Sequence, residues 1–364
     1  MRTYIIFFVL LLACCLNSFT LCAQSEEELF TSIVLHYRQA GKASNVSDFE
    51  NALTSAHAQV EILRGANPKV DREVIGMREL REVFVQAAEL MGNLGRDEQE
   101  AGIALLERLY PGFDLDSPKL ELLPDELIPG FVDSYLNVYN GIQGRLNRYS
   151  YVLFNVKSEK VRNAYVLPFL RESFRQNGYG KQVADICEDV RWCSKTPETR
   201  KEVEALERQY GQLEAGKPAP EFMLKTPTGK AIKLSDLKGK QVFIGIFSSQ
   251  TEQGAMDCFV ALPDRFENIG KCVYCHVWMG EEKERETWQE RVRRQGAGEM
   301  IFLFCETENA LVRDYCVLQT PRYVFVDSDG TLTDAWHAAP GSKYFDLIFG
   351  NKEARNLLEK LGEK

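Results

Sequence analysis

Cysteines are the residues of this chain whose type and number could do chemistry, because a cysteine thiolate can attack a disulfide or bind a metal ion. The 364-residue sequence contains ten of them. One pair, Cys272 and Cys275, has the spacing of a redox dithiol. It continues directly into the largely apolar stretch 276–279, which favours a strand, and residues three apart in a strand point to opposite faces. We therefore expect two buried strand cysteines here, and neither a redox pair nor a zinc site.

The first 23 residues change the cysteine count. Arg2, the apolar run Tyr4–Leu16 and the small residues Cys22-Ala23 predict a signal peptide that is cleaved near Ala23. A run of 13 apolar residues is too short to span a bilayer, which takes about 20. We expect a periplasmic or secreted protein without a transmembrane span. The alternative is cleavage of the lipoprotein type, which leaves a lipid anchor at Cys14 and holds the protein at the envelope.

Seven cysteines remain in the mature chain: Cys187, Cys193, Cys258, Cys272, Cys275, Cys305 and Cys316. Because seven is odd, at least one thiol stays unpaired in a monomer. Two disulfides stay open as alternatives, one between Cys305 and Cys316 and one between Cys187 and Cys193.

Charge and composition exclude several classes of protein. The chain has 44 Lys and Arg against 53 Asp and Glu, and a net charge of -9 argues against a nucleic-acid binder. A 45% hydrophobic and 27% charged composition is typical of a folded globular protein. The four histidines have no close ligand spacing, so we expect no metal and no cofactor: His36, His57, His276 and His337.

Two regions of different character follow the signal peptide (residues 1–23). Residues 24–213 have apolar residues at three- and four-residue spacing, which predicts an all-helical domain. The helices are expected near 26–40, 47–64, 71–93, 97–110, 124–146, 158–176 and 181–192. Residues 214–364 alternate apolar runs with amphipathic stretches, which predicts an α/β domain. The predicted fold class is therefore α + α/β.

The second region predicts a parallel βαβ unit, then a β-hairpin, then a helix. The run Gln241–Phe247 is apolar enough for a buried parallel strand, and Asp329-Gly330 is a hairpin signal. Further strands are expected at Cys272–Met279, Met300–Cys305, Tyr323–Asp327 and Leu332–Trp336. Helices are expected near 255–268, 281–294, 307–316 and 351–361.

Four local motifs of this second region match one family. They are Gly216–Phe222 (GKPAPEF), Leu234–Lys240 (LSDLKGK), Thr320-Pro321 and Asp327–Gly330 (DSDG). With the order of elements they resemble the thioredoxin fold, and more narrowly the extracytoplasmic thiol-disulfide proteins of the TlpA and ResA type and the redoxins. The resemblance implies a thioredoxin-like domain at 214–364 with a cis-proline at Pro321.

The resemblance fails at the residues that would do the chemistry. The family carries Cys-x-x-Cys where the first buried strand passes into its helix, and a helix N-terminus there lowers the thiol pKa. In this chain Thr251 and Gly254 occupy the two cysteine positions. The resemblance implies a thiol-disulfide oxidoreductase. The motif is degenerate in this chain, because a hydroxyl or a hydrogen atom cannot exchange a disulfide. Cys258, one helical turn further on, is the candidate for a displaced thiol.

Three functions follow, in this order of preference. The first is a protein-binding module without dithiol chemistry, in which the 248–254 loop, Thr320 and Pro321 hold an extended protein or peptide segment. The second is a thiol-disulfide oxidoreductase that works through Cys258. The third is a structural protein that acts through its helical domain.

Overall fold

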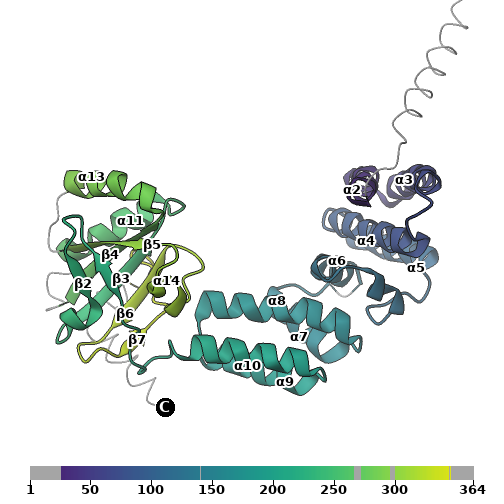
Figure 1. Cartoon of the computed structure of the whole chain (residues 1–364). Helices are drawn as coiled ribbons and strands as arrows, with labels where there is room; N and C mark the ends of the chain where they lie inside the picture. The colour runs from purple at the N-terminus through teal and green to yellow at the C-terminus, as the bar shows by residue number, and fades with distance from the viewer. Residues whose placement is uncertain (1–25, 140, 266–271, 296–299, 344, 346–364) are drawn as a thin grey trace, which may run out of the picture. The chain divides into compact units, whose positions relative to one another are not determined.

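The fold is described from a computed structural model of the chain (Figure 1). It describes residues 26–139, 141–265, 272–295, 300–343 and 345. The chain divides into two compact units. The first holds residues up to Phe169 together with Cys193–Lys195, and the second holds Leu170–Trp192 and the chain from Thr196 onward. The predicted signal peptide and the predicted helix at 351–361 lie outside the described residues.

Nine α-helices precede the first strand in the described part of the chain. They are α2 (Glu26–Tyr37), α3 (Val46–Ala66), α4 (Arg72–Met91), α5 (Arg96–Leu109), α6 (Ile128–Tyr139), α7 (Arg145–Asn155), α8 (Glu159–Asn177), α9 (Lys181–Cys193) and α10 (Pro197–Gly211). Each buries an apolar stripe, as on α3, where the fully buried residues recur at three- and four-residue spacing. None of the helices in these ranges is long and apolar enough to be a candidate membrane span.

One predicted helix is wrong. The sequence predicts a single helix over 124–146, but α6 ends at Tyr139 and α7 begins at Arg145. Between them Gly141 has φ +57° and Gly144 has φ +85°, which is left-handed backbone that ends a right-handed helix. Residues 145–155 therefore form a helix that the sequence pattern does not predict.

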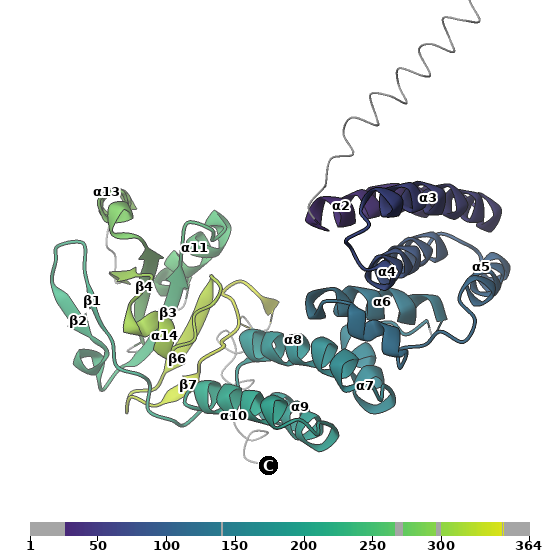
Figure 2. The same cartoon turned by 45° about the vertical axis from the view of Figure 1, so that its right-hand side comes forward.

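A seven-stranded mixed sheet organises the second unit. Its strands are β1 (Met223–Lys225), β2 (Ala231–Lys233), β3 (Gln241–Phe247), β4 (Cys272–Gly280), β5 (Met300–Glu306), β6 (Arg322–Val326) and β7 (Leu332–Asp334). The spatial order is β2-β1-β5-β4-β3-β6-β7. Strands β3, β4 and β5 are parallel, whereas β6 runs antiparallel to β3 and pairs with β7 as a hairpin. Figure 2 shows the β1–β2 hairpin at one edge of the sheet.

In the described ranges, four α-helices lie between the strands of this sheet, as a βαβ unit requires. They are α11 (Gln253–Val260), α12 (Leu262–Arg265), α13 (Arg285–Gln295) and α14 (Ala310–Asp314). The predicted helix 255–268 is thus two short helices, and residues 266–268 lie outside the described ranges. The predicted fold class is confirmed: a helical part is followed by an α/β part with a parallel βαβ unit and a terminal hairpin.

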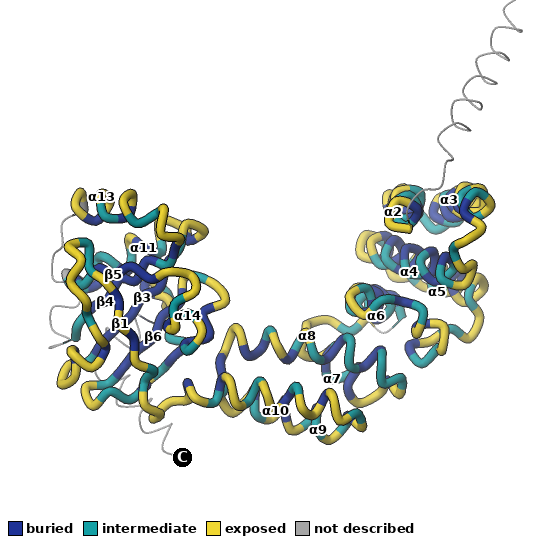
Figure 3. Tube along the Cα trace, in the orientation of Figure 1, coloured by how far each residue is buried: buried dark blue, intermediate teal, exposed yellow. Residues whose placement is uncertain are grey.

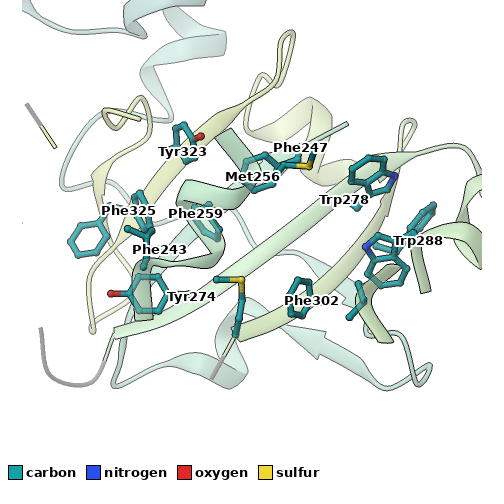
Figure 4. Packing of buried hydrophobic residues seen from close by; sticks show 14 of the residues in the cluster. Phe243, Phe247, Met256, Phe259, Tyr274, Trp278, Trp288, Phe302, Tyr323 and Phe325 are labelled. Carbon is teal, nitrogen blue, oxygen red and sulfur yellow. The ribbon is translucent and has the colours of Figure 1, made fainter. Parts of the chain in front are cut away.

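Aromatic side chains fill one face of this sheet (Figure 4). Phe243 and Phe247 point to this face, and Gly245 lies between them on the same face because side chains alternate along a strand. A Cβ at Gly245 would lie 2.6 Å from the ring of Phe259, so the packing requires glycine there. Figure 3 shows β3 as a buried strand, whereas α13 is buried along one side and exposed along the other.

The second unit also includes helical residues from before residue 213. The indole N–H of Trp336 donates to the carbonyl of Arg175 at 2.9 Å, and its ring lies 5.8 Å from that of Tyr210. A Cβ on Gly178 would lie 2.3 Å from the same indole. The end of α8, with α9 and α10, therefore belongs to the compact unit of the sheet. The change from helices to strands near residue 213 is a change of secondary structure inside that unit.

Candidate functional site

The candidate site lies where β3 passes into α11. Strands β3 and β6 are neighbours, and Ile246 pairs with Arg322 in their antiparallel register. This pairing brings the loop after Phe247 beside the residues that precede β6. The Ser248 and Thr320 hydroxyl oxygens are 2.6 Å apart and share a hydrogen bond. The peptide bond from Thr320 to Pro321 is cis.

Thr251 and Gly254 have different surroundings in this loop. Thr251 is buried, its hydroxyl accepts a hydrogen bond from the backbone N–H of Ser248 at 2.9 Å, and its own N–H donates to the Ser248 carbonyl. Gly254 is exposed in the first turn of α11, and no heavy atom lies within 4 Å of where its Cβ would be. Thr251 thus has a structural role in closing the turn, whereas position 254 has room for a side chain.

The Cys272 and Cys275 pair lies in β4, as the sequence predicts. Cys272 packs beside the aromatic face of the sheet, and Cys275, three residues on, is fully buried and points to the other face. Burial raises the pKa of both thiols to about 12. Because only the thiolate is a nucleophile, these two residues are packing residues at neutral pH.

No disulfide joins any of the seven cysteines in the described part of the chain. The alternative disulfides, from Cys305 to Cys316 and from Cys187 to Cys193, are therefore not formed in this structure. Burial raises the pKa of Cys187 and Cys305 to about 12 and raises that of Cys316 as well.

Cys258 is half-buried on α11, one turn beyond Gly254. Its sulfur lies 3.5 Å from the position of a Cβ on Gly341. The structure therefore places this thiol behind the loop, on the helix, and the hydrogen bond between Ser248 and Thr320 does not involve it.

A cleft of about 330 Å³ opens beside the loop. Ser248, Ser249 and Thr251 form one wall, and Trp278 from β4 and Trp288 from α13 line it as well. Neither tryptophan is predicted as a site residue from the sequence. A usable signal was present, because the carboxyl ends of parallel strands share one edge of a sheet, and Trp278 lies near the end of its predicted strand.

His276 lies under this cleft on the same face of β4 as Trp278. Its ring stacks on Phe247 with 4.5 Å between centroids, and its Nδ1 has no hydrogen-bond partner among the described residues. Burial, with a smaller contribution from the Arg291 charge, lowers the pKa of His276 to about 4. The imidazole is therefore neutral at physiological pH and acts as an aromatic packing group.

His276 makes stability depend on pH. Its pKa of about 4 in the folded chain lies below the ordinary histidine value of about 6.5, so the unfolded chain binds a proton at pH values where the folded chain does not. The stabilisation is complete above pH 6.5 and is lost as pH falls towards 4. We expect His276→Phe to remove about 2–3 kcal/mol of the drop in the free energy of unfolding between about pH 7 and about pH 4.5.

Urea unfolding of the native chain and the variant at both pH values measures this difference. The matched control is His36→Gln on α2, which should keep the native pH dependence. An equal drop in His276→Phe and in the native chain would show that His276 titrates normally.

Within the described ranges, no three His, Cys, Asp or Glu side chains are grouped so that they could hold a metal ion. The groups that line the cleft are instead hydroxyls, indoles and charged side chains from α13 and the turn before it. The arrangement offers hydrogen-bonding groups and apolar surface in one cleft.

No protein-family model matches the chain, and no curated protein matches it either. Solved structures do match in part. The thioredoxin domain of a thiol-disulfide oxidoreductase from Bacteroides vulgatus is 16% identical, over 41% of this chain and 98% of that one, with a TM-score of 0.31. A thiol-disulfide oxidoreductase from Bacteroides fragilis is 13% identical over 40% and 99%, with a TM-score of 0.30. The exposed lipoprotein thioredoxin of Streptococcus pneumoniae is 22% identical over 40% and 100%, with a TM-score of 0.27.

Proposed function

We propose that this protein has a thioredoxin-like domain that binds an extended polypeptide segment and does not exchange disulfides at its 248–254 loop. The observation that carries the proposal is the hydrogen bond between the Ser248 and Thr320 hydroxyls. It joins the loop after β3 to the residues before β6 through two hydroxyls. These are the two segments between which the resemblance implies a bound polypeptide, and neither contains a thiol.

Burial and residue type both argue against dithiol exchange. Thr251 has a hydroxyl at the first motif position and Gly254 has no side chain at the second. The thiols of β4 and β5 have pKa values raised to about 12, so they are protonated at neutral pH. Binding needs none of these groups, because main-chain hydrogen bonds and side-chain contacts can hold an extended segment.

The proposed location is the periplasm or the outside of the cell, by way of the predicted signal peptide (residues 1–23), with a lipid anchor at Cys14 as the alternative. The matching structures include one protein described as an exposed lipoprotein. The proposed boundary between helical and thioredoxin-like domains, at residues 213 and 214, is a change of secondary structure within the second compact unit.

The hydrogen bond between the loops provides the test. Selection of extended decapeptides from a random library on the immobilised full chain should yield binders, and Ser248→Ala and Thr320→Ala should each weaken them about fivefold, since one such bond contributes about 1 kcal/mol. Kd values from fluorescence anisotropy measure the effect. Ser235→Ala and Thr333→Ala, both exposed and away from the loop, are the matched controls. Equal weakening by all four variants, or no binders at all, contradicts the proposal.

A second candidate is a thiol-disulfide oxidoreductase that works through Cys258. It is supported by the half-buried position of this thiol on α11, close to the loop, whereas four other cysteines are fully buried. Insulin reduction by the native chain that is lost in Cys258→Ser would favour this function over peptide binding.

A further inference from the structure

We infer that the cleft beside the 248–254 loop is a subsite for a carboxylate of the bound segment, so that the protein selects acidic peptides. We call it the Trp cleft and define it by Ser248, Thr251, Trp278, Glu284, Trp288 and Arg291. The inference rests on the proposed function, because the segment held at the loop would place its side chain in this cleft.

Two buried donors without partners are the first evidence. Trp278 is 6% exposed and Trp288 is 3% exposed, and neither indole N–H has a hydrogen-bond partner within the described chain. Both indoles belong to the aromatic cluster at the same face of the sheet (Figure 4). A buried donor left unpaired is costly, so an acceptor that reaches either one would recover part of that cost.

Arg291 supplies the charge. Its guanidinium lies 4.9 Å from the centroid of the Trp278 ring, which holds it at the wall of the cleft. No carboxylate of the described residues forms an ion pair with it, whereas Lys283 at the rim is already paired with Glu281 at 2.6 Å. A guanidinium can bind a carboxylate through two parallel hydrogen bonds, which makes an acidic side chain the matching ligand.

Glu284 favours the opposite ligand, a cation. One of its carboxylate oxygens lies 2.6 Å from the position that a Cβ on Gly280 would take, and the Trp278 indole nitrogen lies 3.0 Å from the same point. Glu284 is therefore a neighbour of the unpartnered donor and would repel an incoming carboxylate. A cationic ligand would be attracted by it instead. The two ligands predict opposite effects of neutralising Glu284.

Chemically defined peptide pools test the inference. We use five pools of otherwise randomised decapeptides, each with one fixed central residue: aspartate, asparagine, glutamate, glutamine or lysine. Each pool is applied to the immobilised full chain, and bound peptide is quantified by mass spectrometry. We expect the two acidic pools to be enriched about tenfold over their amide counterparts, since charge-assisted hydrogen bonds contribute about 1.5–3 kcal/mol.

Three variants assign the effect to the cleft. Arg291→Gln should abolish the acidic preference, and Trp288→Phe, which keeps the ring and removes the donor, should reduce it about threefold. Glu284→Gln should raise it. The matched controls are Arg293→Gln and Glu286→Gln on the same helix, which are exposed and do not line the cleft.

The outcomes separate the subsite from the proposed function. Equal binding of all five pools, weakened by Ser248→Ala, would overturn the subsite while peptide binding stands. Preference for the lysine pool, lost in Glu284→Gln, would also overturn it, because the cleft would then take a cation. Absence of binding by every pool would overturn the proposed function and the subsite with it.

Discussion

Replacing Thr251 and Gly254 together by cysteine is expected to give this protein a dithiol activity at its 248–254 loop. Position 254 has no heavy atom within 4 Å of a Cβ, so the second thiol enters open space. Thr251 and cysteine are close in size. Thr251 directly precedes the N-cap Glu252 of α11 and Gly254 lies in the first turn, so both positions are near the helix N-terminus, which favours a thiolate. The introduced pair has the Cys-x-x-Cys spacing next to the loop of Thr320.

Insulin reduction in the presence of dithiothreitol measures the gain. The double variant Thr251→Cys with Gly254→Cys should reduce insulin at least tenfold faster than the native chain, and each single variant should stay near the native rate. The matched control is Thr228→Cys with Ala231→Cys, which places the same spacing in the β1–β2 hairpin. An inactive double variant that folds and forms its disulfide would show that this loop is not a thioredoxin-like active site. Activity of the native chain that depends on Cys258 would support the second candidate function.

Loss of the Trp336 side chain is expected to weaken the second unit. It donates to the Arg175 carbonyl, touches the Tyr210 ring and covers the Arg322 guanidinium at 3.6 Å from the indole centroid. Arg322 is 6% exposed, its Nε and one terminal nitrogen have no hydrogen-bond partner among the described residues, and burial lowers its pKa to about 10. Trp336→Ala would remove the packing and the cation–π contact together.

The expected cost is about 3 kcal/mol in the free energy of unfolding. Denaturant unfolding followed by far-ultraviolet circular dichroism measures it, and hydrogen exchange should place the loss in α10 and β6. Trp192, which is 80% exposed, gives the matched control Trp192→Ala, with an expected change below about 0.5 kcal/mol. A similar small change for Trp336→Ala would mean that the indole does not hold the helices to the sheet.

The strands were the most predictable part of the fold. The run Gln241–Phe247 is apolar at every position but its first and is β3 to the residue, because a strand covered on both faces needs no polar alternation. The single helix predicted over 124–146 is wrong, because its apolar pattern does not show where the helix ends. Its apolar spacing continues through Gly141 and Gly144, and only the backbone angles of those residues end it.

The candidate site was predictable in its loop and not in its cleft. Thr251, Gly254, Thr320 and Pro321 follow from their place between elements that the sequence identifies. Trp278 lies near the end of its predicted strand, but its contact with Arg291 depends on how α13 packs on the sheet and leaves no local sequence pattern. The contact between Trp336 and the end of α8 could not be predicted from local sequence patterns either, because the two residues are far apart in the sequence.

That contact has a consequence for the order in which the protein folds. The backbone hydrogen bonds inside the helices α8 to α10 are local, so these helices can form as soon as they are synthesised. Their contact with Trp336 joins residues 161 positions apart, so at about 5–20 residues per second it waits roughly 8 to 30 seconds longer. During that interval Tyr210 lacks its aromatic partner and the apolar faces of these helices are open to water. The nascent chain therefore exposes Tyr210 until Trp336, which follows β7, has been synthesised.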